Sequence, residues 1–279
     1  MILRNNLVPE YLKYQLEIDD AISSVLKSGR YTLSEKVSTF ESEFSAYNGV
    51  SYCLGVANGT DAIILALRAC GIKDGDEVIT TPYTAYATIS AIISAGAVPI
   101  FVDVCEDSYL IDIEKVLLAI GPKTKAIVAV HLFGNIVDIE RLRLLAGENI
   151  YIIEDAAQAH GSSMNNRKAG SIGDIGCFSF YPTKNLGGYG DGGAIITNNN
   201  DLYNKIKSMR MYGMRDKDHV QIHGMNSRLD EIQAAILSVK LKYLDKLNNQ
   251  RNLIAKKYIS GLNNELIKHQ NILKNTFSN

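Results

Sequence analysis

A single lysine follows directly after an apolar stretch and precedes a run of glycines. The segment is Gly176-Cys-Phe-Ser-Phe-Tyr-Pro-Thr-Lys184-Asn-Leu-Gly-Gly-Tyr-Gly-Asp-Gly-Gly193. Pro182 ends the expected strand because it cannot donate to a ladder, and the glycines let the backbone run close to another group. A lysine held in such a turn can act as a covalent nucleophile toward an aldehyde or ketone. The alternative is a surface lysine beside an ordinary glycine turn.

The glycine run also contains the spacing G-x-G-x-x-G at Gly188, Gly190 and Gly193. In a dinucleotide site this pattern follows a strand and opens a helix. Here it leads into Gly-Ala-Ile-Ile-Thr-Asn at 193–198, which is β-branched and typical of a strand. The sequence therefore argues against a nicotinamide dinucleotide.

A second candidate is the turn Asn58-Gly59-Thr60-Asp61, between an expected strand and an expected helix. Free backbone N–H groups at a helix start bind phosphate well, because the helix dipole favours negative charge there. The hydroxyl of Ser179, on the strand before Lys184, could reach the same phosphate. A helix cap without a ligand is the alternative for this turn.

Asp155 ends the apolar run Ile152-Ile153-Glu154-Asp155. Ligands of open α/β sheets bind beyond the carboxyl ends of the strands. A carboxylate buried there needs a cation, and a protonated ring nitrogen would be one. Glu154 would point to the opposite face, and a helix-capping role is the alternative for Asp155. Ring nitrogen, phosphate and aldehyde together describe pyridoxal 5′-phosphate, bonded to Lys184 and held at its nitrogen by Asp155.

The elements that position these residues alternate between strand and helix from residue 51 onward. Short apolar runs separated by helical segments indicate a parallel sheet covered on both faces, with right-handed crossovers. Strands near 175–181 and 193–198 should pair antiparallel because their connection is short. We expect the other strands at 52–57, 77–81, 98–104, 125–131 and 150–155, and helices at 60–70, 84–95, 111–119 and 137–145.

Helical periodicity also marks both ends of the chain. An N-terminal arm of two helices, 9–29 and 34–47, should pack on the main domain. The tail, 265–279, is polar, rich in asparagine and without strand signals. Between residue 200 and this tail we expect a helix near 201–212, a polar loop at 213–224 and a long helix at 227–260.

Five segments, taken in order, resemble a single family. The resemblance is to the DegT/DnrJ/EryC1/StrS family of nucleotide-sugar aminotransferases, over residues 10–260. It implies an α/β fold of the type I aspartate aminotransferase class, with a mostly parallel sheet and helices on both faces. The segments are Asn58-Gly-Thr-Asp-Ala62, Thr81-Pro-Tyr-Thr-Ala-Tyr-Ala-Thr88, Glu154-Asp-Ala-Ala-Gln-Ala-His-Gly161, Phe178-Ser-Phe-Tyr-Pro-Thr-Lys-Asn185 and Gly224-Met-Asn-Ser-Arg-Leu-Asp-Glu-Ile-Gln-Ala234.

The resemblance also implies roles for individual residues. Lys184 would bond to the cofactor and then move the proton of the 1,3-shift, while Asp155 binds the pyridine nitrogen. Gln158 would lie by the phenolic oxygen of the cofactor. The phosphate would be held by a group of small and polar residues, Gly59, Thr60 and Ser179, joined by Asn226 from the other subunit of a homodimer.

This chain departs from the family pattern in two places. Where many members stack an aromatic ring on the cofactor, it has Ala85, with Tyr83 and Tyr86 nearby; which tyrosine covers the ring stays open, and we place Tyr86 among the cofactor-binding residues. Members usually carry a further C-terminal domain that helps to bind the sugar nucleotide. We therefore expect an arm and large domain over 1–245 and a truncated small domain over 246–279.

Composition limits the other possibilities. A hydrophobic content of 46%, a charged content of 21% and a net charge of -1 suit an ordinary globular protein with no general attraction to nucleic acid or anionic membranes. The 4 cysteines are scattered and lack the spacing of a zinc site or a disulfide frame. His219 and His223 are four residues apart, but no third ligand is evident, so we expect no metal. No signal peptide or membrane span is visible, and we expect a cytoplasmic protein.

These inferences favour one function. The chain would transfer an amino group from an amino acid, L-glutamate by expectation, to a nucleotide-linked keto-deoxysugar, in the biosynthesis of amino sugars for surface polysaccharide such as O-antigen. Retention of Lys184 favours amino transfer, because the dehydratase branch of the family has histidine there. The alternative is a truncated, non-catalytic remnant of the fold that binds the cofactor or a partner.

Overall fold

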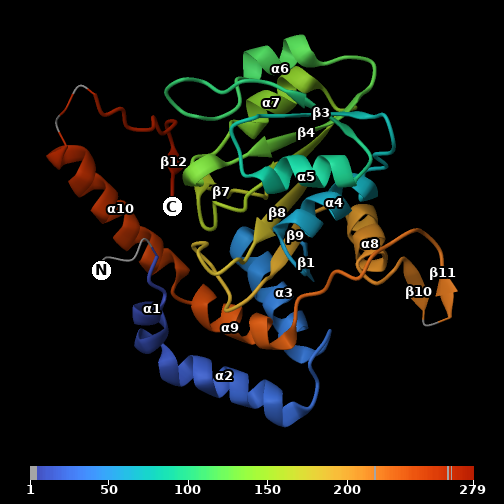
Figure 1. The fold of residues 1–279 in the computed structure, drawn as a ribbon, viewed down its shortest axis with the longest axis vertical. Coiled ribbons are helices and arrows are strands. Elements are labelled where there is room, and N and C mark those ends of the chain that lie inside the picture. Colours follow the sequence, from blue (N-terminus) through green and yellow to red (C-terminus); the bar gives the residue numbers. More distant parts are fainter. Residues whose placement is uncertain (1–4, 217, 263, 265) are drawn as a thin grey trace.

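A seven-stranded sheet forms the centre of the computed structural model (Figure 1). The structure describes residues 5–216, 218–262, 264 and 266–279; residues 1–4, 217, 263 and 265, which belong to the predicted arm, polar loop and tail, lie outside the described part. The strand order is β1-β9-β8-β5-β4-β2-β3. The strands are β1 (Tyr52–Val56), β2 (Glu77–Thr80), β3 (Val98–Phe101), β4 (Thr124–Val130), β5 (Tyr151–Asp155), β8 (Ile175–Ser179) and β9 (Gly193–Thr197).

Only β9 runs against its neighbours in this sheet. It pairs antiparallel with β1 and β8, whereas the pairs β8–β5, β5–β4, β4–β2 and β2–β3 are all parallel. Both the mostly parallel sheet and the antiparallel pairing near 175–198 are therefore confirmed. The interior of β4 is buried because its apolar run leaves no polar side chain to face water.

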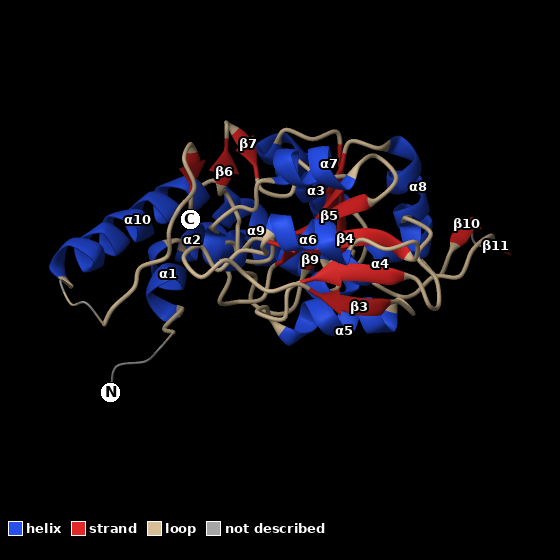
Figure 2. Ribbon diagram, turned by 90° about the horizontal axis from the view of Figure 1, so that it is seen from above, coloured by secondary structure: helices blue, strands red, loops and turns tan. Residues whose placement is uncertain are grey.

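Helices cover both faces of the sheet, as the sequence predicts (Figures 1 and 2). Alternate strand residues serve the two faces: Ile153 packs in the core beneath α4, α5 and α8, and Ile152 in the core beneath α6 and α7. Helices α3 and α9 pack over the β8–β9 side of the second face. The bounds are α3 (Glu35–Asn48), α4 (Gly59–Ala69), α5 (Tyr86–Ser94), α6 (Ile113–Ala119), α7 (Ile139–Ala146), α8 (Asn200–Met209) and α9 (Glu231–Leu241).

The N-terminal arm packs on α9, but its first part is two helices. Helix α1 (Val8–Lys13) ends at Tyr14, whose non-helical φ of -117° and ψ of 20° separate it from α2 (Gln15–Ser28). The ring of Tyr14 is buried and stacks on Tyr243, with 4.1 Å between centroids. This tertiary contact overrides the local helical pattern that predicted one helix over 9–29.

The C-terminal region differs from prediction in three places. The helix expected at 227–260 is divided near Tyr243 into α9 and α10 (Leu244–Gly261). The polar loop contains a projecting hairpin of β10 (Met214–Asp216) and β11 (His219–Val220). The tail, predicted to lack strands, contains β12 (Thr276–Phe277), which pairs with β6 (Ser163–Met164); β6 also pairs with β7 (Arg167–Lys168). A two-residue strand depends on its distant partner, so no local signal marks it.

The predicted domain boundary between residues 245 and 246 lies just inside the start of α10, and the division stays a prediction. Among the helices that the structure describes, none has the length and apolar character required to cross a bilayer.

Candidate active site

One cavity of about 320 Å³ lies at the carboxyl ends of the parallel strands. It brings together six of the eight predicted cofactor-binding residues. A larger groove of about 840 Å³ runs between α10 and the C-terminal segment, but it contains none of these residues. We take the smaller cavity as the site, because polar groups of different chemistry converge there. The six residues are Gly59, Thr60, Asp155, Gln158, Ser179 and Lys184.

The start of α4 forms one wall of this cavity. Asn58 caps the helix, since its side-chain oxygen accepts a hydrogen bond from the Asp61 N–H at 2.8 Å. The N–H groups of Gly59 and Thr60, in the first turn, have no partner within the helix. Gly59 is packed so closely that an added Cβ would lie 2.8 Å from the Cβ of Ser179. The turn is therefore a capped helix start with free N–H groups, and its close packing leaves room only for glycine at position 59; phosphate binding there stays a prediction.

Asp155 lies at the floor of the cavity and is only 6% exposed. Its Oδ2 accepts a hydrogen bond from the Thr88 hydroxyl at 2.7 Å, and its Oδ1 accepts one from the Ala157 N–H at 3.2 Å. The side chain belongs to the α5 face of the sheet. A carboxylate held in this way presents negative charge to any cationic group within the cavity.

Lys184 is half-buried in the turn that follows β8. Burial lowers the pKa of its amine, and the nearby charge of Asp155 opposes that effect. A lowered pKa increases the fraction of neutral amine, which is the nucleophilic form.

The glycine loop after Lys184 is fixed by residues of α9. The ammonium group of Lys240 donates to the Gly187 carbonyl at 2.6 Å, and Gln233 Oε1 accepts from the Tyr189 N–H at 2.8 Å. Because the loop is held at both points, the lysine that precedes it is held as well.

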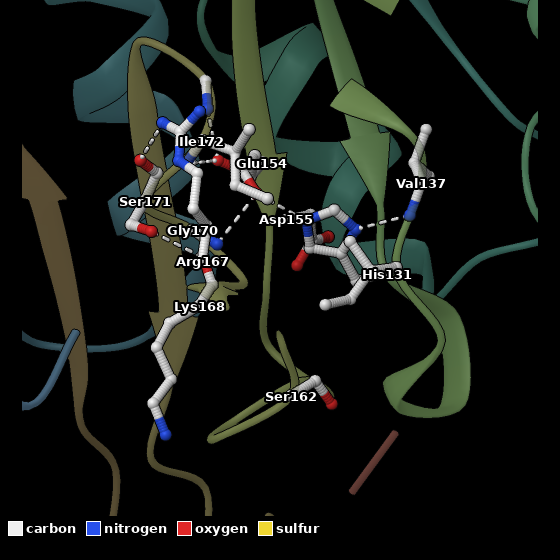
Figure 3. Close-up of polar contacts among 12 residues, drawn as sticks. His131, Val137, Glu154, Asp155, Ser162, Arg167, Lys168, Gly170, Ser171 and Ile172 are labelled. Atoms are coloured by element: carbon white, nitrogen blue, oxygen red, sulfur yellow. Dashed lines mark hydrogen bonds and ion pairs between the residues drawn. The ribbon is translucent and has the colours of Figure 1, made fainter. Parts of the chain in front are cut away.

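Glu154 faces the other side of β5, as predicted, and satisfies a separate set of donors (Figure 3). Its Oε2 accepts from His131 Nε2 at 2.7 Å and from the Gly170 N–H at 2.8 Å. Its Oε1 accepts from the N–H groups of Ile172 at 2.7 Å and Gly173 at 2.5 Å. Burial tends to raise the pKa of this carboxyl, but the hydrogen bonds from His131 and the backbone outweigh it and lower the pKa. Glu154 therefore stabilises the structure on the face of the sheet opposite to the cavity.

Two buried histidines, His131 and His160, differ in whether their ring nitrogens have hydrogen-bond partners. His131 lines the cavity and is fully satisfied, because its Nδ1 accepts from the Val137 N–H at 3.1 Å while Nε2 donates to Glu154. His160 is buried against Phe178, and its ring nitrogens have no hydrogen-bond partner among the described residues. Burial and the nearby positive charge of Lys184 lower the pKa of His160 to about 3. Both rings are thus buried, but only the first is satisfied.

Two predicted cofactor residues lie outside the cavity. Tyr86 begins α5 with 75% of its surface exposed, and the wall on that side is formed by Thr84, Ala85 and Ala87. Asn226 is exposed and pairs with Met211 in an isolated bridge. The predicted role of Asn226 requires a second subunit. The assignments of Tyr86 and Asn226 to the cofactor therefore both stay predictions.

Sequence reasoning missed two residues that act on the site. Thr88 is the last residue of the segment 81–88, which the sequence analysis used only for the family resemblance. Lys240 is one of many lysines on predicted helices. A polar residue on an otherwise apolar helix face was the available signal, and it applies to both positions.

Comparison with known proteins gives a family match along most of the chain. The model of the DegT/DnrJ/EryC1/StrS aminotransferase family matches residues 13–275. The chain is 46% identical to the dTDP-3-amino-3,4,6-trideoxy-α-D-glucose transaminase of Micromonospora megalomicea subsp. nigra, over 91% of this chain and 68% of that protein.

Solved structures are similar as well. The X-ray structure of Streptomyces venezuelae DesV, in complex with a ketimine intermediate, superposes with a TM-score of 0.95 at 42% identity, covering 98% of this chain and 74% of that one. The GDP-4-keto-6-deoxy-D-mannose-3-dehydratase of E. coli, solved with bound hydrated PLP, gives a TM-score of 0.83 at 27% identity over 89% and 70% of the two chains.

Proposed function

The chain belongs to the DegT/DnrJ/EryC1/StrS aminotransferase family, and on that premise we propose that it transfers an amino group from L-glutamate to a keto-deoxysugar carried on a nucleotide. The observation that carries this proposal is the convergence of Lys184, Asp155 and the Gly59–Thr60 turn in one cavity. The name of the Micromonospora relative, a dTDP-amino-sugar transaminase, supports the substrate class. We extend the proposal to amino sugars of surface polysaccharides.

The cofactor is pyridoxal 5′-phosphate, as in the PLP-bound structural neighbour. The residues of the cavity fit this group. A glycine-lined turn at a helix start suits the phosphate, a buried carboxylate suits a protonated ring nitrogen, and a half-buried lysine suits the aldehyde. When bound, the cofactor supplies an electron sink for the bonds at the amino-bearing carbon.

The residues of the chain supply the remaining steps of our proposed mechanism. Gly59, Thr60 and Ser179 bind the phosphate and fix the position of the ring. Asp155 keeps the ring nitrogen protonated. Lys184 Nζ, whose pKa is lowered by burial, would accept a proton from the carbon that bears the amino group and deliver it to the carbon on the other side of the nitrogen, which is the 1,3-shift. Gln158 lines the same cavity, on the side of the phenolic oxygen in this proposal.

A spectroscopic experiment tests the cofactor site. Purified protein, loaded with pyridoxal 5′-phosphate and then separated from unbound cofactor, should absorb in the visible, and Lys184→Ala should abolish that band. Lys242→Ala is the matched control, because this lysine is 61% exposed and distant from the cavity lining. A wild-type protein that stays colourless with added cofactor would contradict the assignment.

A substrate panel tests the reaction. Amine formation is measured with glutamate and a series of 3-keto and 4-keto sugar nucleotides, and we expect turnover of at least one of them. Bound cofactor without turnover of any member would instead favour a non-catalytic binding protein.

We further propose that the enzyme is a homodimer in which Asn226 reaches the phosphate site of the partner subunit. Its exposure, outside the cavity of its own chain, supports this arrangement. Mixing inactive Lys184→Ala chains with Asn226→Ala chains should restore activity, because each mixed dimer contains one intact site. Absence of restored activity in verified mixed dimers would contradict a shared site.

A further inference from the structure

Two hydroxyls, one buried and one partly buried, connect the start of helix α5 to the carboxylate at the floor of the cavity. Thr88, with a side chain that is 0% exposed, donates its hydroxyl proton to Asp155 Oδ2 at 2.7 Å. Thr84 Oγ1 lies 2.9 Å from Thr88 Oγ1, and Thr84 itself lines the cavity.

The direction of this chain follows from proton counting. A threonine hydroxyl has one proton, and an ionised carboxylate only accepts hydrogen bonds. The proton of Thr88 is committed to Asp155, so the proton between the two hydroxyls must come from Thr84. The chain therefore runs from Thr84 through Thr88 to Asp155, and each donor strengthens the next bond.

The hydrogen bond from Thr88 is also the stronger of the two that orient this carboxylate. The other one, from the Ala157 N–H to Oδ1, is 3.2 Å long. Hydrogen bonds to charged groups are short and strong, and a carboxylate with one such bond removed can rotate about its terminal torsion. Rotation would turn the oxygen that faces the cavity away from a ring nitrogen.

We propose that Thr88 is a positioning residue for the cofactor: its hydroxyl, oriented by Thr84, holds Asp155 in the rotamer that binds the ring nitrogen of pyridoxal 5′-phosphate. This inference rests on the proposed function, because it concerns the same site. It assigns to the Thr81–Thr88 segment a physical role in addition to its family resemblance.

The test compares three variants by equilibrium titration of the cofactor-free protein with pyridoxal 5′-phosphate, followed by visible absorption. Thr88→Val keeps the shape and removes the hydroxyl, and we expect about 10-fold weaker cofactor affinity from losing one hydrogen bond to a charged group. Thr88→Ser keeps the hydroxyl and should restore most of the affinity.

The matched control is Thr80→Val. Thr80 is equally buried, at 0% exposure, and its hydroxyl donates one hydrogen bond at 3.0 Å to the Val128 carbonyl in the sheet. Both valine variants lose one buried hydroxyl, so both should lose thermal stability without cofactor, and Thr88→Val should lose at least as much because its hydrogen bond goes to a charged group. Only Thr88→Val should weaken the cofactor affinity.

The outcomes separate the two proposals. If the wild-type chain takes up no cofactor, the proposed function fails before any variant is compared. If it does, unchanged affinity in Thr88→Val, equal weakening in Thr80→Val, or a Thr88→Ser variant as weak as Thr88→Val would overturn the positioning role alone. Should Thr88→Val not fold, Thr84→Val decides: the inference requires about 3-fold weaker affinity for it, and wild-type affinity would overturn it.

Discussion

Glu154→Gln should be among the most destabilising conservative substitutions in this chain. Each carboxylate oxygen of Glu154 accepts two hydrogen bonds: Oε2 from His131 and Gly170, Oε1 from Ile172 and Gly173. Glutamine has one oxygen and one NH₂ group. Whichever way the amide turns, two buried donors will face two N–H groups instead of an acceptor.

The magnitude follows from that count. Leaving a buried donor unsatisfied costs about 1 to 3 kcal/mol, so two such donors cost roughly 2 to 6 kcal/mol. Typical domains have a free energy of unfolding of only about 5 to 15 kcal/mol. The substitution should therefore remove a large part of the stability, without changing side-chain size.

Urea unfolding of wild type and variant measures this difference, provided that both transitions have the same slope. Glu114→Gln is the control: Glu114 pairs with Arg141 on the surface, where both side chains are more than half exposed, and its loss should change stability by less than about 0.5 kcal/mol. A change below about 1 kcal/mol in Glu154→Gln would refute the reasoning, because the two donors that face the NH₂ group would then have found other partners.

The same carboxylate gives a pH dependence with a defined sign. Its pKa is lowered in the folded protein, so Glu154 contributes stability above its unfolded pKa of about 4.3. That contribution is lost as the pH falls through the lower folded value. Glutamine does not titrate, so below about pH 4 the wild type should lose stability more steeply than the variant. Parallel curves for the two proteins would contradict the lowered pKa.

Two further substitutions test the cavity wall and the lysine loop. Gly59→Ala should weaken cofactor binding at least about 10-fold, because the new Cβ would lie 2.8 Å from the Cβ of Ser179. Titration with cofactor measures the change in affinity. The control Gly121→Ala, where an added Cβ meets nothing closer than 3.8 Å, should bind the cofactor with wild-type affinity. Lys240→Met should lower the free energy of unfolding in urea by about 2 kcal/mol, because this side chain is only 5% exposed, holds the glycine loop and pairs with the carboxylate of Glu10. The surface variant Lys242→Met should change it by less than about 0.5 kcal/mol. Equal losses in the two variants would contradict this prediction.

The central sheet could be predicted because its strands are short apolar runs that need burial on both faces. The run at 125–131, for example, became β4 (Thr124–Val130) with a shift of one residue. The breaks at Tyr14 and Tyr243 could not be predicted, because they depend on two rings that meet across the fold. Strand β12 was missed for the same reason, since its partner β6 lies more than a hundred residues earlier.

At the candidate site, the residues whose own chemical groups suggest a role were visible in the sequence. Lys184 and Asp155 have groups that few other roles require at the end of a strand. Thr88 and Lys240 act only through what they contact, and the contact partner lies on another element in each case. Sequence patterns report a residue's type and spacing; they do not report which carbonyl or carboxylate lies opposite.

The neighbouring carboxylates of β5 show what distinguishes a supporting residue from a functional one. A carboxylate has about four acceptor positions. Glu154 uses all of them on protein donors, so it has no capacity left for a ligand. Among the residues that the structure describes, Asp155 accepts only from Thr88 and Ala157, and its side chain lines the cavity with acceptor positions to spare. Because side chains alternate along a strand, the two residues lie on opposite faces of the sheet. The protein donors on each face then leave only Asp155, of the two, with free positions to accept a hydrogen bond from a protonated nitrogen of a ligand.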